Sequence, residues 1–378
     1  MTEIKIPLKM HVGGPCKPVV KAGDKVKRGQ LIAEPSGLGA NIHASFTGEI
    51  SAVTDGEIVI KPDDVQNFDE YVKIPDTKTN LEAIAAAGVV GAGGAGFPTA
   101  VKLKTEIPNG IANAAECEPL LAHNIHQIEE HAAELVRGVK YAMEITKAPK
   151  GYIAIKPKHK KAVIELIKAV RNEDNIDVFR LPDMYPAGDE RVIVREVMGI
   201  ELEPGQLPGT VGACIDNVET LKNIVRAIED RKPVIDKDIT VSGRVAHKES
   251  VFVDVPVGTP MGDLIERAGG FINPHGEIVI GGPQTGRPGT EESPVTKTSG
   301  GCLVAMPFPQ EKRKAGILIC ECGGSEERLT QIAEAMGAEV VSKERCKRMV
   351  EVDGRYRCGL PGVCPGQAEK VMALKRGG

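Results

Sequence analysis

Apolar and polar residues are arranged differently in successive parts of the chain, and these changes predict separate structural units. Residues 1–62 form short apolar runs between turns at nearly regular spacing, which predicts a small module of β-strands. From about 78 to 236, apolar residues at helical spacing, as in 160–170, alternate with short apolar runs such as 151–155. That alternation predicts βαβ units with a largely parallel sheet. A charged, proline-containing stretch at 62–79 predicts a linker between the two units.

Two further units are predicted in the second half of the chain. Within 237–290 the two-residue period returns in two strands, followed by a helix and another strand, an order that predicts a β-grasp module. A connection rich in proline, glycine and serine follows at 281–301. The segment 310–378 predicts a strand, a helix whose N-cap is Ser325, and a second strand. The fold class expected from these patterns is therefore a multidomain α/β protein.

Composition and charge exclude several classes of protein. The net charge of −4 argues against general nucleic-acid binding. No run of about 18 apolar residues exists, and the first residues lack the apolar core of a signal peptide. We therefore expect a cytoplasmic protein without a transmembrane segment, compatible with peripheral association with a membrane. Nine cysteines in a reducing compartment favour metal or redox chemistry over structural disulfides.

Glycine is the residue type in clear excess, with 43 in the chain, and it is densest at 88–96. Gly91, Gly93 and Gly96 match the G-x-G-x-x-G spacing of dinucleotide-binding loops, but an alanine-rich helical pattern precedes them instead of a strand. Residues without a Cβ still let the backbone approach a phosphate or a flat ring closely. The cluster predicts a nucleotide or flavin site, and the alternative is a glycine-rich turn between two helices.

The same loop carries a resemblance to a known family. The segment GAGGAGFPTAVKLK (91–104) resembles the flavin loop of the 51-kDa NADH-oxidising subunit of respiratory complex I, and more closely that of RnfC-type subunits. Three further family blocks follow in order: NAAECEP (113–119), YPAGDER (185–191) and DNVET (216–220). The resemblance implies a Rossmann-like domain that binds FMN and NADH. It also implies a barrel-sandwich domain at 1–62, with a structural or docking role because the hairpin tip has no lysine to modify.

The resemblance assigns roles to residues by position. It implies that Lys102 meets the FMN phosphate, that Phe97 stacks on the NADH adenine, and that Glu118 and Glu190 lie beside the nicotinamide as the catalytic pair. The glycines implied to wrap the flavin and the nucleotide are Gly91, Gly93, Gly94 and Gly96. The residues implied to line the flavin are Asn113, Glu116, Tyr185, Gly188, Asn217 and Thr220. Hydride transfer needs positioning more than acid–base chemistry, which suits this set.

Two features beside these blocks carry separate expectations. The complex I pattern has asparagine where Asp216 stands, so a carboxylate pointing inward would lower the flavin potential. His123, His126 and His131 lie near helical spacing and predict a hydrated helix face instead of a metal site.

Five cysteines in the last segment form the other candidate site: Cys320, Cys322, Cys346, Cys358 and Cys364. Their spacing matches neither a zinc ribbon nor a bacterial ferredoxin, so an iron–sulfur cluster, a redox dithiol, zinc and unliganded thiols all stay open. The first two precede a predicted helix start, where thiol pKa values fall. The two ferredoxin motifs with which RnfC-type chains continue are absent from this sequence.

The tail suggests a partner. The segment LICECGGSEERL (318–329) and the residues after it resemble the RnfC-like electron-transfer proteins associated with D-proline reductase, the PrdC family. This implies an NADH-dependent oxidoreductase that passes electrons to D-proline reductase or another acceptor protein. Members of that group are longer, which implies a truncated chain here. Two alternatives stay open: a docking or scaffold subunit with a vestigial nucleotide site, and a protein similar to cobalamin reductases.

Overall fold

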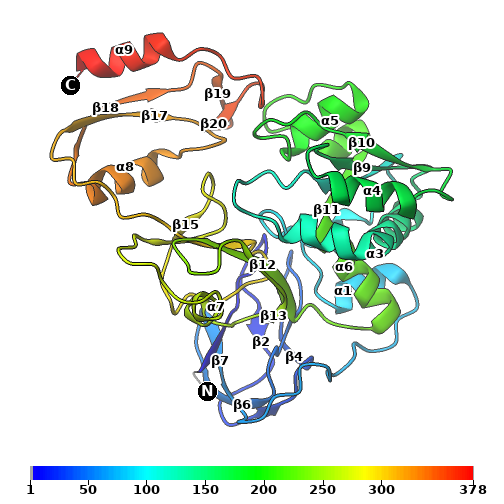
Figure 1. Ribbon diagram of the computed structural model, residues 1–378. Helices are drawn as coiled ribbons and strands as arrows, with labels where there is room; N and C mark the ends of the chain where they lie inside the picture. Colours follow the sequence, from blue (N-terminus) through cyan, green and yellow to red (C-terminus); the bar gives the residue numbers. More distant parts are fainter. Residues whose placement is uncertain (1–2, 378) are drawn as a thin grey trace.

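The computed structural model describes residues 3–377, which fold into four units in sequence order (Figure 1). The first unit packs a four-stranded sheet, in the order β1-β7-β6-β3, against a three-stranded sheet, β2-β4-β5, with every strand pair antiparallel. Its aliphatic core includes Ile6, Ile32 and Ile60, all fully buried. The strands are β1 (Ile4–Pro7), β2 (Lys17–Pro18), β3 (Lys25–Val26), β4 (Leu31–Glu34), β5 (Ile42–His43), β6 (Gly48–Val53) and β7 (Glu57–Pro62).

The predicted linker has no helix or strand in residues 63–79, but it packs against its neighbours. Ile74 is buried, and its backbone N–H donates to the carbonyl of Arg231. Val72 donates to the carbonyl of Arg28 in the first unit. The segment therefore joins the first two units along a packed surface.

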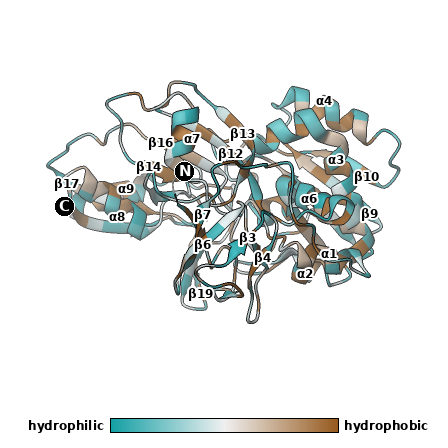
Figure 2. Cartoon of the chain, turned by 90° about the horizontal axis from the view of Figure 1, so that it is seen from below, coloured by the Kyte–Doolittle hydropathy of each residue, from teal (hydrophilic) through white to brown (hydrophobic). Residues whose placement is uncertain are grey.

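The second unit is built on a four-stranded parallel sheet in the order β10-β9-β8-β11. Helices cover both faces because the crossovers are right-handed, and those through α3 and α4 move across the sheet in the opposite direction to the one through α5. Ile128, Leu135 and Leu166 of α3 and α4 pack on one face, and Ile193 of α5 packs on the other. Hydrophilic and hydrophobic residues alternate around α4 (Figure 2), as expected for a helix with one buried face.

The elements of this unit confirm the predicted alternation of helices and strands. The strands are β8 (Asn109–Ala114), β9 (Lys150–Ile155), β10 (Ile176–Arg180) and β11 (Ala213–Asn217). The helices are α1 (Asn80–Ala86), α2 (Thr99–Lys102), α3 (His123–Thr146), α4 (Lys160–Ala169), α5 (Glu190–Met198) and α6 (Val218–Val225), with short η1 (Pro208–Val211) and η2 (Arg226–Asp230).

The third unit is a mixed five-stranded sheet in the order β13-β12-β16-β14-β15, with α7 packed against it. Its central strand, β16, runs parallel to β12 and lies beyond the predicted boundary at residue 290. The proline, glycine and serine residues around 281–300 are typical of a loop, so the strand that follows them was not predicted from the sequence. The elements are β12 (Asp236–Gly243), β13 (Ser250–Pro256), α7 (Met261–Arg267), β14 (Ile278–Ile280), β15 (Arg287–Gly289) and β16 (Gly301–Val304).

The fourth unit pairs two parallel strands through a helical crossover and adds a hairpin. Ser325 caps the helix as predicted, accepting a hydrogen bond from the backbone N–H of Arg328 at 3.1 Å. The unit lies at the opposite end of the molecule from the first sheets, with its hairpin beside α5 (Figure 1). Its elements are β17 (Lys314–Ile319), α8 (Glu326–Ala335), β18 (Glu339–Arg345), β19 (Met349–Val352), β20 (Arg355–Cys358) and α9 (Ala368–Gly377).

Candidate functional site

The candidate site lies where the strand order of the parallel sheet reverses. The chain passes from β8 to β9 and β10 on one side, and then returns to β11 on the other side of β8. Loops diverge at such a point, and open α/β sheets bind ligands there, beyond the carboxyl ends of the strands. Asn113 lies near the end of β8 and Asn217 ends β11, so two of the predicted site residues lie on this edge.

The glycine loop closes over this edge, and three of its glycines differ in whether a side chain would fit. A Cβ on Gly93 would lie 2.7 Å from Nδ2 of Asn217, so only glycine lets the loop rest on that amide. Gly96 has φ +75°, and a Cβ there would lie 3.0 Å from the carbonyl oxygen of Met10 in the first unit. A Cβ on Gly94 would meet nothing within 4 Å, so the loop presents bare backbone to open space there.

Two adjoining cavities lie on either side of this loop. The first has a volume of about 440 Å³, and the second has a volume of about 420 Å³. Both volumes fall within the usual range for small-molecule sites. The two cavities share five wall residues: Gly93, Gly94, Asn113, Gly188 and Asn217.

The first cavity contains the cation that was predicted to meet a phosphate. Lys102 lines it together with Phe97 and Glu190, and Phe97 is 40% exposed at the surface. The Lys102 Nζ lies 3.3 Å from Oδ1 of Asp216 and 3.9 Å from Oε1 of Glu190, and it donates to the carbonyl of Ile215. The buried Asp216 therefore points inward, as considered from the sequence, and it partly neutralises this lysine.

The charges in the first cavity shift one another. Burial opposes the charge on Lys102, but the Asp216 carboxylate outweighs it and raises the lysine pKa. Burial raises the pKa of Glu190, with Lys102 opposing the shift. Lys102 therefore stays a cation at neutral pH, which suits a phosphate ligand. The helix after the loop, α2, is a single turn of four residues.

The second cavity is walled by the second and third units together. Glu116 accepts a hydrogen bond at 3.0 Å from the backbone N–H of Asn124 near the start of α3. Burial raises the pKa of Glu116 to about 7, and the hydrogen bonds from Asn124 oppose the shift. The buried Oδ1 of Asn124 has no hydrogen-bond partner among the described residues. A polar atom left unpaired in a cavity wall is available to a ligand.

Glu118 is tied to the third unit. Its carboxylate accepts hydrogen bonds from the backbone N–H groups of Gln284 and Thr285, both at 3.0 Å, and from the Thr285 hydroxyl. Glu118 lines the second cavity, whereas Glu190 lines the first. The two carboxylates proposed as a catalytic pair therefore lie in the walls of different cavities.

Two other predicted flavin-lining residues lie outside both cavity walls in the described part of the chain. Thr220 is buried, and its hydroxyl accepts a hydrogen bond at 2.9 Å from the backbone N–H of Ala92, which anchors the glycine loop to α6. Tyr185 is half-buried, and burial followed by the charge of Glu118 raises its pKa. Thr220 therefore supports the glycine loop from α6.

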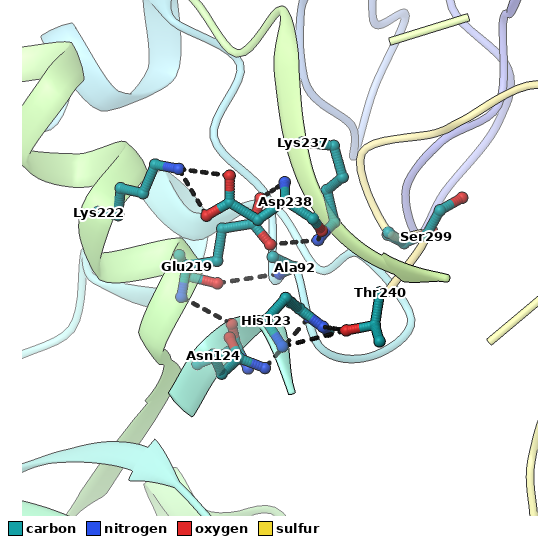
Figure 3. Close-up of polar contacts among 12 residues, drawn as sticks. Ala92, His123, Asn124, Glu219, Lys222, Lys237, Asp238, Thr240 and Ser299 are labelled. Carbon is teal, nitrogen blue, oxygen red and sulfur yellow. Dashed lines mark hydrogen bonds and ion pairs between the residues drawn. The ribbon is translucent and has the colours of Figure 1, made fainter. Parts of the chain in front are cut away.

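A buried network of charges lies behind the loop (Figure 3). Lys237 of β12 donates to Glu219 of α6, and Lys222 of α6 donates to both oxygens of Asp238, at 2.7 and 2.6 Å. The four side chains are at most 2% exposed. Such pairs are costly to break because a partner left alone is an uncompensated buried charge. The network therefore fixes the position of the third unit against α6.

The prediction of a hydrated helix face for the three histidines is wrong for His123. His123 is buried at the start of α3, and its Nδ1 lies 3.1 Å from the hydroxyl of Thr240 on β12 (Figure 3). His131 is exposed, at a point where the backbone of α3 departs from helical geometry. His123 thus lines the second cavity and contacts another unit instead of facing water, because the third unit covers this end of α3.

The third unit supplies cavity residues that the sequence did not indicate. Gly281, Gly282, Thr285, Arg287, Thr296, Thr298, Ser299 and Gly300 all line the second cavity. They lie in the segment 281–301 that was interpreted as a connection. Loop residues have no periodicity, so only the packing of β14 and β16 beside β12 brings them to the site.

The C-terminal cysteines are brought together only in part. The Sγ atoms of Cys320 and Cys322 lie 3.3 Å apart. Within residues 3–377, no group of three or more His, Cys, Asp or Glu side chains is arranged to hold a metal ion. Cys346 receives a hydrogen bond at 3.0 Å from Nε2 of Gln367, Cys358 is buried, and Cys364 is exposed.

The two paired thiols titrate differently. A hydrogen bond from Cys322 lowers the pKa of Cys320 to about 6, against the effect of burial and with help from the turn's N–H groups. The Cys320 thiolate and burial raise the pKa of Cys322. The lower thiol pKa expected from the helix start thus occurs at Cys320, with the neighbouring thiol as its main cause.

Among the described residues, no helix is both long enough and apolar enough to cross a bilayer.

Comparison with known proteins assigns families to two of the units. Residues 84–226 match the Nuo51 FMN-binding domain, and residues 1–67 match the RnfC barrel sandwich hybrid domain. These matches cover the switch-point sheet and the N-terminal antiparallel sheets, respectively.

Curated relatives extend the similarity beyond these domains. The chain is 32% identical to the C subunit of the Na⁺-translocating ferredoxin:NAD⁺ oxidoreductase complex of Acetobacterium woodii, over 79% of this chain and 72% of the relative. It is 35% identical to the C subunit of the proton-translocating ferredoxin:NAD⁺ oxidoreductase complex of Clostridium ljungdahlii, over 80% and 70%. It is 44% identical to the cobalamin reductase PduS of Salmonella typhimurium, over 59% of this chain and about half of that relative, 49%.

A solved structure shares the fold. An NAD⁺-reducing [NiFe]-hydrogenase in the air-oxidised state superposes with a TM-score of 0.53 at 22% identity, covering 61% of this chain and 47% of that chain. At this identity the likeness concerns the fold alone.

Proposed function

The chain belongs to the family of C subunits of ion-translocating ferredoxin:NAD⁺ oxidoreductases, and on that premise we propose that it is a flavin-dependent oxidoreductase subunit that oxidises NADH and passes the electrons to a partner protein. The observation that carries the proposal is the pair of adjoining cavities at the switch point, which share the backbone of Gly93 and Gly94. FMN in the first cavity and the nicotinamide end of NADH in the second would meet at that shared wall, with the NADH adenine reaching Phe97 at the exposed side of the first cavity.

The residues of the first cavity fit FMN. Gly94 leaves open backbone beside a cavity of about 440 Å³, and Lys102 supplies a partly buried cation for a phosphate. Bound FMN would accept a hydride from NADH and could release the two electrons singly or as a pair. In this proposal the glycine loop and Asn217 position the flavin, Lys102 binds its phosphate, and Phe97 stacks on the NADH adenine. Gly91, Gly96, Asn113 and Gly188 complete the wall.

The second cavity would then receive part of the nicotinamide nucleotide or exclude water from the flavin. Glu118 holds the loop at Gln284 and Thr285 in place, which closes the cavity on the side of the third unit. Glu116, with its pKa raised to about 7, can hold or release a proton near neutral pH. Positioning and exclusion of water are the contributions that a hydride transfer requires from the protein.

The electron acceptor is the finer part of the proposal. The tail resembles that of the PrdC family, which supports D-proline reductase as the partner, and the mixed sheet of the third unit is proposed to be an SLBB-type β-grasp module that contributes to docking. Cobalamin reduction is the second candidate, favoured by the 44% identity to PduS. Adding D-proline reductase with D-proline, or a corrinoid, to protein supplied with NADH distinguishes these acceptors.

Anaerobic titration with FMN followed by NADH tests the proposed activity. We expect FMN absorbance to shift on binding and to bleach when NADH is added. Phe97→Ala should weaken NADH binding about tenfold and FMN binding much less, because an aromatic stack contributes about 1 kcal/mol or more. Val101→Ala, an exposed side chain on the same turn, is the matched control. A chain that binds neither ligand would contradict the proposal, and equal loss of both ligands in Phe97→Ala would indicate damage to the fold.

A further inference from the structure

The Cys320–Cys322 pair lies in a closed turn between β17 and α8. The backbone N–H of Cys320 donates to the carbonyl of Gly324 at 3.0 Å, and the N–H of Gly324 donates back to Cys320 at 3.2 Å. Both thiols are partly buried, with 3.3 Å between the sulfurs. A disulfide has an S–S distance of about 2.05 Å, so the sulfurs need to approach by little more than 1 Å to bond.

The residue between them fixes this turn to the flavin-binding unit. One Glu321 oxygen lies 3.1 Å from Nη2 of Arg191 on α5 and also accepts the backbone N–H of Cys358. The other oxygen accepts a hydrogen bond from Arg357 at 3.1 Å. Arg191 directly follows Glu190, which lines the first cavity. A carboxylate held by two guanidinium groups and a backbone N–H is a strong, oriented contact.

The other side of the turn meets the loop that closes the second cavity. A Cβ on Gly323 would lie 3.2 Å from Oε1 of Gln284, so this side chain occupies the space beside the glycine. The backbone N–H of Gln284 donates to Glu118, a wall residue of that cavity. The turn is thus bonded through Glu321 to α5 beside the first cavity, and it lies next to the loop that closes the second cavity.

We propose that Cys320 and Cys322 form a reversible redox disulfide that carries electrons from the flavin cavity to a partner protein bearing a disulfide. The proposal rests on the function proposed above for its source of electrons. It differs from a metal site because it needs only these two of the five clustered cysteines.

The chemistry balances in two steps. In the first, the Cys320–Cys322 disulfide takes up two electrons and two protons from the reduced flavin, its S–S bond breaks, and two thiols form. In the second, one thiolate attacks the partner's disulfide and forms a mixed disulfide. The other thiol then attacks this bond, which regenerates the Cys320–Cys322 disulfide and releases the partner as a dithiol.

The first experiment needs no flavin, so it tests the pair independently of the proposed function. The full chain is equilibrated anaerobically with reduced and oxidised glutathione at graded ratios, alkylated, and mapped by mass spectrometry. We expect Cys320 and Cys322 to become protected from alkylation at the same glutathione ratio, and to become reactive again together on reduction. Cys322→Ser should instead trap a glutathione adduct on Cys320, and Cys320→Ser should lose the paired protection completely.

Cys364→Ser separates the pair from a site made by all five cysteines. If the pair is the redox unit, this variant keeps the paired protection unchanged. If the anaerobic protein contains iron or zinc that either Cys364→Ser or Cys320→Ser removes, the thiols are ligands and the proposal is wrong. Independent alkylation of Cys320 and Cys322 at every glutathione ratio would also overturn it. Thermal unfolding of each variant identifies any loss that reflects misfolding.

The second experiment tests the link to the flavin. The oxidised protein is supplied with FMN and NADH, and the appearance of free Cys320 and Cys322 is followed by alkylation. We expect both thiols to appear at the expense of NADH. If NADH bleaches FMN while the disulfide persists, the relay is wrong and the proposed function stands. If FMN is not reduced at all, the proposed function fails, and the glutathione result still decides whether the pair is redox-active.

Discussion

Two groups of charged residues flank the glycine loop, and they differ in what surrounds them. Behind the loop, the pairs Lys222–Asp238 and Lys237–Glu219 are both buried (Figure 3). In front of it, Lys102 and Asp216 form a looser contact of 3.3 Å beside an open cavity, and Lys102 is 27% exposed. The paired, enclosed group connects units, whereas the group beside open space can exchange its partner for a ligand.

A third lysine shows what happens when a buried cation lacks a carboxylate. Lys297 is 2% exposed, and its Nζ donates to the backbone carbonyls of Asn41 and Gly88, at 2.6 and 2.8 Å. Burial lowers its pKa to about 7, opposed by Cys16. For Lys222, by contrast, Asp238 outweighs burial and raises the pKa. The charge state of a buried lysine is therefore determined by whether it has a carboxylate partner and not by burial alone.

Breaking the enclosed network should have the largest effect. Lys222→Met leaves the Asp238 carboxylate buried without its cation, so we expect a loss of about 3–5 kcal/mol in the free energy of unfolding. Lys140→Met is the matched control, because Lys140 pairs with Glu173 at the surface and should lose at most about 1 kcal/mol. Urea denaturation measures both variants. If both variants lost a similarly small part of the free energy of unfolding, the distinction between enclosed and open pairs would be wrong.

Removing the unpaired lysine should change the pH dependence of stability. The pKa of Lys297 is about 7 in the folded chain, below its usual value of 10.5, so the unfolded chain binds more protons between these values. Stability should therefore rise with pH above about 7, by up to about 1.4 kcal/mol per pH unit. In Lys297→Met this rise should disappear. Urea midpoints of both proteins between pH 6 and about 8 test it, because the cysteine titration that the two proteins share cancels in their difference. Parallel curves for the two proteins would contradict it.

The smallest effect is expected at the open pair, and on binding instead of folding. Asp216→Asn removes a negative charge beside Lys102, which should strengthen FMN binding by about 1 kcal/mol, or about fivefold. Isothermal titration of the apoprotein with FMN measures the change. Glu190→Gln, 3.9 Å from the same lysine, should have a smaller effect in the same direction. Weaker FMN binding in Asp216→Asn would show that Lys102 needs its carboxylate.

Three of the residues predicted for the site from the sequence lie together at the edge of the parallel sheet. Gly93, Asn113 and Asn217 meet because short motifs placed on the ends of parallel strands converge wherever the strand order reverses. The N-cap at Ser325 could also be predicted from the sequence, because helix capping depends on neighbouring residues. Local sequence patterns of this kind can be interpreted without knowing how the other units pack.

Contacts between units could not be predicted in the same way. The buried position of His123 depends on Thr240 of β12, and the anchoring of Glu118 depends on Gln284 and Thr285. These partners are separated by more than a hundred residues and carry no shared periodicity. The thiol pair is intermediate, because the C-x-C spacing was visible in the sequence, but its attachment to Arg191 was not.

The contact between Arg28 and Asp236 has a consequence for how the chain assembles. Both side chains are buried and lie 2.6 Å apart, yet they are 208 positions apart in the sequence. Arg28 also donates to the carbonyl of Ser45, so the first unit can orient it but cannot neutralise it. During synthesis, the N-terminal sheets must therefore keep this guanidinium hydrated until more than half of the chain has emerged. Final consolidation of the first unit should thus be a late, non-local event in folding.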